Sequence, residues 1–335
     1  MPVVTKADLL GYIAGAVAEC GWSLALLDSP PTHPFRLNIF SGDQSLNIRV
    51  YIWNITHGGG QRSQHEYRIQ ITSVPDISSE PNFKTLILGY WAEAEVFAGF
   101  DFAKHHGAIA YSPSIQIREE ALQTAYLQGF ALHSKGGGEL AIAFRPDYFV
   151  DYCKNCTTLH EFGETTIQTE ALAAVTEETT QINEAAVELV PVRHRDVLRK
   201  VAAGHVAVQF RNRVLTVYQH RCAMCGLQMG LVEAAHIVPA SHPESSYETA
   251  NGVALCASHH RAFDTGLVAF NTRYDVIINE SMISDLQRRD RSGGEGQFRE
   301  NLRRMIILPP ATNDRPNAGL VREGLLVRGW PHSAL

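Results

Sequence analysis

Two short pairs of candidate metal ligands constrain the fold of this chain more than any other feature. Cys222 and Cys225 are separated by two residues, and Cys256 and His259 have the same spacing after 30 intervening residues. A structural Zn²⁺ takes four cysteine or histidine ligands in a tetrahedron. A DNA-reading zinc finger has roughly a dozen residues between its two pairs. The longer gap here therefore predicts a folded unit built between the two pairs.

The segment between the pairs carries residues suited to catalysis. His236 ends an apolar run typical of a short buried strand, and Asn251 opens a second apolar run. His260 and Asp264 are four residues apart, which places them on one face of a helix. A hairpin followed by a helix would bring these four side chains together beside the zinc.

The order and spacing of these residues resemble the HNH (ββα-metal) endonucleases, in particular a subgroup with AAHI in its first motif. The matching sequences are AAHI at 234–237 and NGVALCASHHRAFDTG at 251–266, and the resemblance covers about residues 195–280. It implies a zinc-stapled ββα-metal nuclease domain, with Zn²⁺ on the two ligand pairs.

Phosphodiester hydrolysis requires an activated water and a cation on the scissile phosphate. We expect His236 to be the general base, because a neutral imidazole accepts a proton from water near pH 7. We expect His260 and Asp264 to hold Mg²⁺, Mn²⁺ or another divalent cation, and Asn251 to orient His236 through hydrogen bonds. Many HNH relatives carry an aspartate directly before the base as a further metal ligand, whereas this chain has Ala235.

The departure at Ala235 leaves two alternatives open. Glu233 is two residues upstream on the same strand face and could replace the missing carboxylate. Without it the cation has fewer protein ligands, which leaves its identity open, and a DNA-binding regulator with an inactive nuclease is the alternative from another class of protein. Four basic residues are either phosphate contacts or solvated surface residues: Arg261, Arg211, Arg213 and Arg221.

A second set of possible metal ligands consists of Cys153, Cys156 and His160. The set lacks a fourth ligand, so it predicts either two ordinary thiols or a second zinc site.

Composition and charge limit the class of protein. The chain has 335 residues, 45% hydrophobic and 19% charged, which are globular values. It contains no run of about 18 apolar residues, so we expect no membrane span. Cysteines at metal-ligand spacing favour a reducing cytoplasm. The net charge of −6 is unevenly distributed, because residues 193–335 carry 18 basic against 13 acidic residues, and 17 of the 18 are arginine. This basic excess suits a DNA partner.

The composition also predicts the domain organisation, in an α+β fold. Residues 1–156 form a β-rich mixed domain, with a first helix at about 7–20 and strands at about 36–40, 46–54, 66–73, 85–91, 96–102, 114–118 and 139–144. Residues 157–192 are acidic, with 8 acidic residues in the stretch 151–192, and are expected to be a linker, either a polar helix or a flexible tether. Residues 193–335 form the nuclease domain with an arginine-rich C-terminal extension.

The first domain resembles the amino-terminal domains that occur beside HNH modules in restriction-type endonucleases and are named for association with methylases. The resembling segments are VYIWNITHGGGQRSQHEYRIQIT, VFAGFDFAKH and SPSIQIREEAL. The resemblance implies recognition of a DNA sequence or a modified base. Aromatic residues that could stack on an extruded base, or else belong to the core, are Trp53, Tyr67, Trp91, Phe97 and Phe100.

We therefore predict a metal-dependent restriction-type endonuclease acting on double-stranded DNA. One HNH site cuts one strand, so cutting both strands predicts a homodimer or two successive nicks. Two alternatives remain within the enzyme class. The nuclease could require methylated or hydroxymethylated DNA, or it could be an antiviral defence effector whose first domain senses a ligand. The acidic charge of residues 1–150, with 10 basic and 14 acidic residues, suits the second alternative.

Overall fold

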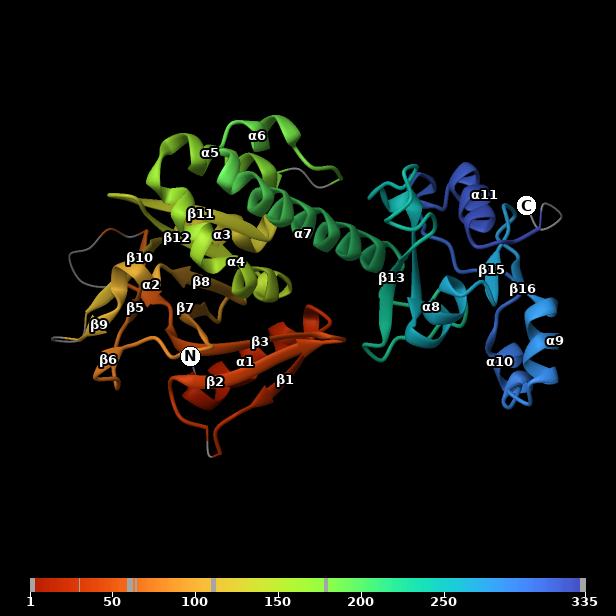
Figure 1. The fold of residues 1–335 in the computed structure, drawn as a ribbon, viewed down its shortest axis with the longest axis horizontal. Helices are drawn as coiled ribbons and strands as arrows, with labels where there is room; N and C mark the ends of the chain where they lie inside the picture. Colours follow the sequence, from red (N-terminus) through yellow and green to blue (C-terminus); the bar gives the residue numbers. More distant parts are fainter. Residues whose placement is uncertain are drawn as a thin grey trace. The chain divides into compact units, whose positions relative to one another are not determined.

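The computed structural model describes residues 4–29, 31–58, 63, 65–109, 113–177 and 180–331. It divides into two compact units. Unit 1 comprises residues 1–178 and 182–205, and unit 2 comprises residues 179–181 and 206–335. Unit 1 is rich in β-strands (Figure 1). Unit 2 contains the two ligand pairs. The predicted α+β fold class is confirmed.

A seven-stranded sheet forms the centre of unit 1. Only the pairing of β3 with β7 is parallel, and the other pairs are antiparallel. The strands, in spatial order, are β1 (Ser23–Leu26), β2 (Phe35–Ser41), β3 (Gln44–Asn54), β7 (Lys84–Trp91), β8 (Val96–Phe100), β12 (Glu139–Phe144) and β11 (Phe130–Gly136).

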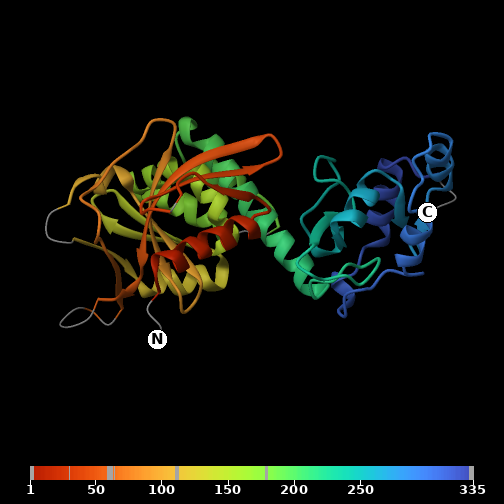
Figure 2. The same cartoon turned by 90° about the horizontal axis from the view of Figure 1, so that it is seen from below.

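Helices cover both faces of this sheet (Figures 1 and 2). All five residues of β8 are buried, as expected for a strand covered on both faces. Phe97 packs its ring 5.2 Å from that of Phe149, on the face of α1 (Lys6–Glu19) and α4 (Phe149–Glu161). The other face packs on α3 (Glu119–Gln128) and a small sheet of β4 (Thr56–His57), β5 (Glu66–Gln70) and β10 (Ser114–Arg118).

Residues 157–192, the predicted linker, are mostly helical and packed into unit 1. They include the end of α4 and the helices α5 (Thr166–Glu177) and α6 (Glu184–Glu188). Leu172 and Val175 are fully buried, and α5 packs on β11. The acidic residues lie mainly on the exposed faces of these helices. The negative charge that predicted a linker therefore lies on the solvated surface of unit 1. The boundary between the units falls after residue 205, inside α7 (Val192–Val217).

Unit 2 is built around a hairpin and a helix. Strand β13 (Val232–His236) pairs antiparallel with β14 (Gly252–Cys256), and α8 (Ala257–Asp264) follows directly. The end of α7 packs on this hairpin so closely that a Cβ atom at Gly252 would lie 2.2 Å from Cγ2 of Val214. The remaining elements are β15 (Val268–Phe270), β16 (Val276–Ile278), α9 (Glu280–Arg288), α10 (Glu295–Asn301) and α11 (Ala318–Val327).

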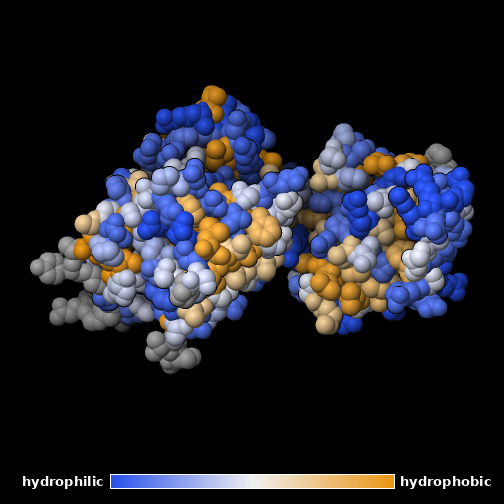
Figure 3. Space-filling view, turned by 60° about the horizontal axis from the view of Figure 1, so that its bottom comes forward, coloured by the Kyte–Doolittle hydropathy of each residue, from blue (hydrophilic) through white to orange (hydrophobic). Residues whose placement is uncertain are grey.

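The surface of both units is largely hydrophilic on the face drawn in Figure 3, with separate apolar patches. Among the residues with exposed apolar side chains, Met229 has a relative exposure of 79%. None of the helices in the described part of the chain combines the length and the apolar run that a bilayer crossing requires.

Candidate active site

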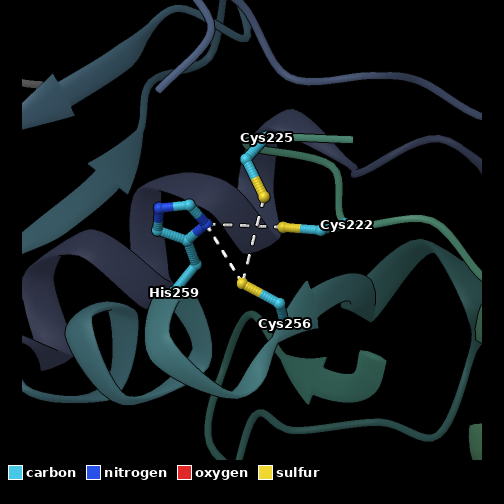
Figure 4. Close-up of side chains that lie close together, drawn as sticks. All are labelled: Cys222, Cys225, Cys256 and His259. Carbon is cyan, nitrogen blue, oxygen red and sulfur yellow. Dashed lines mark hydrogen bonds between the residues drawn. The ribbon is translucent and has the colours of Figure 1, made fainter. Parts of the chain in front are cut away.

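Four side chains meet where the turn after α7 approaches the start of α8 (Figure 4). The Sγ atom of Cys222 lies 3.5 Å from Nδ1 of His259, and Sγ of Cys256 lies 3.3 Å from the same nitrogen. The Sγ atoms of Cys225 and Cys256 are 3.9 Å apart. All four ligand atoms lie within 4.8 Å of one another. We call these residues the Cys3His cluster.

The Cys3His cluster fits a tetrahedral Zn²⁺. Metal–ligand bonds of about 2.0–2.3 Å place tetrahedral ligand atoms about 3.3–3.8 Å apart, close to the three distances above. The backbone supports the arrangement, because Gly226 has a φ of 84° and its N–H donates to Cys222 O at 2.8 Å. Ala223 N–H also donates to Ala254 O at 2.7 Å, which ties the cysteine turn to β14.

His236 lies at the end of β13 against two aromatic rings. Its imidazole stacks on Phe210 at a centroid distance of 4.1 Å, and Tyr247 approaches edge-on at 5.2 Å. Burial, followed by the nearby charge of Arg328, lowers the pKa of His236 to about 4. Its Nε2 atom is buried without a hydrogen-bond partner among the described residues. The ring is therefore neutral near pH 7, as a general base must be.

Asn251 is fully buried and holds the chain that follows His236. Val238 N–H donates to its Oδ1 at 2.9 Å, and its Nδ2 donates to Ser246 O at 2.8 Å. Ile237 N–H also donates to the backbone carbonyl of Asn251 at 2.8 Å. These bonds fix the exit of β13, and the expected role of Asn251 in orienting His236 stays a prediction.

His260 lies on α8 between two carboxylates. Its Nδ1 is 2.6 Å from Oε2 of Glu233, and its Nε2 is 3.4 Å from Oδ2 of Asp264. The charges of Asp264 and His260 both act on the pKa of His236, so the three groups form one electrostatic neighbourhood. A carboxylate and an imidazole on one helix face are suitable ligands for a divalent cation.

Two family models match the chain. Residues 222–271 match the model described as HNH endonuclease, and residues 46–153 match the one described as methylase-associated X1. The chain contains an HNH endonuclease domain. Its hairpin, helix and Cys3His cluster lie inside the matched residues, and the predicted resemblance is confirmed on both segments. An HNH endonuclease is a phosphodiester hydrolase.

A search of solved structures finds a chain titled "Modification dependent TagI restriction endonuclease". It is 11% identical, with 87% of this chain and 84% of that chain covered at a TM-score of 0.30. No curated protein sequence matches this chain.

Three residues that contact the HNH site could not be identified from the sequence. Phe210 and Tyr247 pack on His236, and Arg328 donates from its Nη2 to His236 O at 2.9 Å. Phe210 precedes the matched residues and Arg328 follows them, so neither belongs to a local motif. Tyr247 lies in the loop between β13 and β14, where no spacing rule singles out one aromatic residue.

The four candidate DNA-contacting arginines fall into two groups. Arg213 donates from Nη2 to Tyr247 O at 2.8 Å, so it supports the aromatic ring beside His236. Arg221 and Arg261 are exposed, and Arg211 is partly exposed. Exposure leaves the guanidinium groups of these three available to phosphate, and a DNA contact remains a prediction for each.

The candidate residues of unit 1 are mostly buried. Trp53, Trp91, Phe97 and Phe100 belong to the core, whereas Tyr67 is only partly buried, between His57 and Trp91.

The possible second metal cluster, Cys153, Cys156 and His160, is also buried, on α4. Both ring nitrogens of His160 have partners, with Nδ1 at 2.9 Å from Leu140 O and Nε2 at 3.0 Å from Tyr152 Oη. Within the described residues, the Cys3His cluster is the one group of three or more histidine, cysteine or acidic side chains whose ligand atoms lie close enough together to hold a metal ion.

Proposed function

We propose that this chain is a metal-dependent DNA endonuclease of restriction type, in which unit 1 selects the target and the HNH domain cuts it. One observation carries the proposal. The guanidinium of Arg328 contacts both the backbone of His236, at the end of β13, and Asp264 on α8, whose carboxylate also contacts the imidazole of His260. General base and metal ligands are the two components that phosphodiester hydrolysis needs in one place.

In this mechanism His236 takes a proton from the attacking water. The stacked Phe210 ring and the edge of Tyr247 restrict the imidazole to one orientation and exclude bulk water from its faces. Asn251 fixes the backbone that leaves β13, so the base cannot move away from α8. Pre-positioned groups of this kind lower the barrier because no reorganisation is needed during the reaction.

His260 and Asp264 would hold the catalytic cation, Mg²⁺ or Mn²⁺. Such a cation supplies charge neutralisation at the scissile phosphate. Glu233 contacts Nδ1 of His260, the ring nitrogen that faces away from Asp264. This contact favours a role for Glu233 in orienting the imidazole over a role as the metal ligand that is missing at position 235. The Cys3His cluster would hold Zn²⁺ as a structural ion, separate from the chemistry.

Double-stranded DNA is the proposed substrate, and unit 1 would choose the site. The match of residues 46–153 to a methylase-associated family supports a restriction-type role, because restriction and methylation act on the same sequences. One HNH site per chain favours a homodimer for cutting both strands. The thiols of the Cys3His cluster must stay reduced to bind metal, which favours the cytoplasm.

The test is a nicking assay on supercoiled plasmid with zinc-loaded protein in Mg²⁺ or Mn²⁺. We expect nicked and linear products from the wild type and none above background from His236→Ala. The control is His242→Ala, a change in a histidine of the loop that follows β13, outside the proposed site. A His236→Ala protein that is folded, zinc-loaded and as active as wild type would refute the assignment of the base.

The same assay on plasmids with and without methylated or hydroxymethylated bases decides how unit 1 selects DNA. Cleavage of unmodified DNA alone supports conventional restriction. Cleavage of modified DNA alone supports the modification-dependent alternative. Cleavage of neither, with activity appearing only when a cell extract or small-molecule fraction is added, would support the ligand-gated effector instead.

A further inference from the structure

Helix α11 is pressed against the residues that follow His236. Val321 and Leu325 of this helix are buried in the core of unit 2. At Gly324 the approach is so close that a Cβ atom would lie 2.4 Å from Ile237 O. The helix therefore presents its C-terminal end to the chain leaving β13, although it lies outside the segment that matches the HNH model.

Arg328, directly after α11, binds this chain through its guanidinium group. Its Nη2 donates to His236 O at 2.9 Å, and its Nη1 donates to Ile237 O and, at 3.2 Å, to Gly324 O. The side chain is only 5% exposed. A buried guanidinium needs several acceptors to offset the loss of hydration, and these carbonyl oxygens provide them for Nη1 and Nη2.

The same guanidinium also contacts α8. Its Nη2 lies 3.4 Å from Oδ1 of Asp264, and its central carbon lies 4.2 Å from the centroid of the Phe263 ring. The other carboxylate oxygen, Oδ2, faces Nε2 of His260 at 3.4 Å. Arg328 thus occupies one oxygen of Asp264 and leaves the other directed toward the imidazole.

We propose that Arg328 is a positioning residue of the nuclease site, which sets the separation between the general base and the cation ligands. The proposal rests on the metal-dependent function above. One rigid, planar side chain binds both the backbone of His236 and the carboxylate of Asp264, so a change there moves the two components relative to each other. The C-terminal extension is then part of the active site and not only a cover for the core.

The experiment compares Arg328→Lys and Arg328→Met with wild type. The control variant is Arg322→Met, at an exposed arginine of α11. Binding of Mn²⁺ to zinc-loaded protein is measured by calorimetry, with Asp264→Ala identifying the heat that belongs to the catalytic site. Plasmid nicking gives kcat and the half-activating Mn²⁺ concentration. Zinc content and thermal unfolding check that each variant is folded.

We expect Arg328→Met to weaken Mn²⁺ binding and to lower kcat by about 10- to 100-fold, the usual effect of removing a partner of a metal ligand. Arg328→Lys should fold, because it keeps the charge and the long stem, and should show a smaller loss, because an ammonium cannot reproduce the forked contacts. Arg322→Met should behave as wild type. If Arg328→Met does not fold, the lysine variant decides the question.

Lysine and methionine variants with wild-type Mn²⁺ affinity and kcat, but a lower melting temperature, would overturn the proposal and leave Arg328 a purely structural residue. The proposed function would be untouched in that case, because the wild type would still bind Mn²⁺ and nick DNA. A wild type that neither binds Mn²⁺ nor nicks DNA would overturn the function as well.

Discussion

At the scale of single residues, the two ring nitrogens of His260 have different carboxylate neighbours. Glu233 is the closer one, at 2.6 Å from Nδ1, and Asp264 lies 3.4 Å from Nε2. A carboxylate that accepts a hydrogen bond from Nδ1–H fixes the tautomer and leaves the lone pair on Nε2. The nitrogen that faces Asp264 is then the one able to bind a cation.

The first prediction concerns Glu233. Glu233→Ala should reduce Mn²⁺ affinity or nicking activity by about 10- to 100-fold, because the tautomer and ring orientation of His260 are no longer fixed. Glu233→Gln should lose less, since its amide oxygen can still accept from Nδ1–H. Glu244→Ala, at an exposed acidic residue of the same unit, is the control. Equal activity of Glu233→Ala and wild type across a Mn²⁺ titration would contradict the role.

The second prediction concerns the pH dependence of the proposed base. His236 must be neutral to accept a proton, so activity falls as the pH drops through its pKa. Because burial lowers that pKa to about 4, the acidic limb of kcat/KM at saturating Mn²⁺ should lie well below pH 6.5, the usual pKa of histidine. The measurement is a pH–rate profile of nicking from pH 4.5 to 8. An acidic limb at pH 6.5 or higher would argue against His236 as the base.

At the scale of elements, the HNH domain depends on how three short segments are held together. The turn containing Cys222 and Cys225 and the start of α8 are joined by ligand side chains, and α7 packs on β14 at Gly252. The hairpin and the helix are too short to be stable alone. The Cys3His cluster and the contact with α7 therefore supply much of the stability of the site.

Removal of zinc is the third prediction. A strong zinc chelator should unfold unit 2, because a structural zinc contributes about 10–16 kcal/mol, comparable to the stability of a whole domain. Hydrogen exchange followed by mass spectrometry should show protection lost in residues 206–331 and kept in the core strands of unit 1, which serve as the internal control. Unchanged protection in β13, β14 and α8 after complete zinc removal would show that the ion is not needed for the fold.

The contact of α7 with β14 gives the fourth prediction. Gly252→Ala should destabilise unit 2 by about 1–3 kcal/mol, because the added methyl overlaps Val214 in a packed core. Activity should fall too, since the displaced helix carries Phe210, which stacks on His236. Urea unfolding and nicking measure the two effects.

The matched control for this change is Gly293→Ala, where a Cβ atom would meet no atom within 4 Å. Adding Val214→Ala to Gly252→Ala makes room for the methyl group and should restore part of the lost activity. A stable and fully active Gly252→Ala protein would show that the contact is looser than the structure indicates.

At the scale of the whole molecule, each unit was predictable to the extent that its residues interact locally. The Cys3His cluster and the β13–β14–α8 order follow from spacing and apolar runs in one short stretch. The contact of Arg328 with Asp264 could not be predicted from the sequence, because it joins residues 64 positions apart and depends on the packing of α11. In unit 1 seven strands matched their predicted positions, whereas both edge strands of the main sheet were missed. The four residues of β1 are only partly buried or exposed, and only the first two residues of β11 are buried.

The acidic segment was predicted to be a linker, either a polar helix or a flexible tether. It is helical, but its helices are amphipathic and packed into unit 1, with Leu172 and Val175 fully buried. Composition averages over the two faces of a helix, so it could not distinguish a packed helix from a solvated chain. The periodicity of the apolar residues was the signal that could have done so.

The fifth prediction concerns the acid stability of unit 1. Burial lowers the pKa of His160 to about 4, so the folded unit keeps this ring neutral while the unfolded chain takes up a proton below about pH 6.5. The contribution of His160 to the stability of unit 1 is therefore fully present above pH 6.5 and declines as the pH falls toward 4. Between pH 7 and 5 the loss from this residue should be about 2 kcal/mol.

Urea unfolding of the full chain, followed by hydrogen exchange in unit 1, measures that loss. His160→Gln should have a shallower pH dependence than wild type, although its stability at pH 7 will be lower. His65→Gln, at a side chain that is 71% exposed, is the control and should keep the wild-type slope. If the free energy of unfolding depends on pH equally in all three proteins, a group other than His160 dominates the acid destabilisation of unit 1.

Adjacent residues of α8 would serve two different metal sites in the proposed function. His259 turns toward the cysteines, and His260 turns toward Glu233 and Asp264. A single peptide bond therefore separates the ion that would be permanent from the ion that would exchange with solvent. Inserting or deleting one residue there would rotate the remaining helix by about 100° and misdirect one set of ligands. A substitution beside this dipeptide can therefore alter one site alone, whereas a change in the number of residues would disturb the geometry between the two.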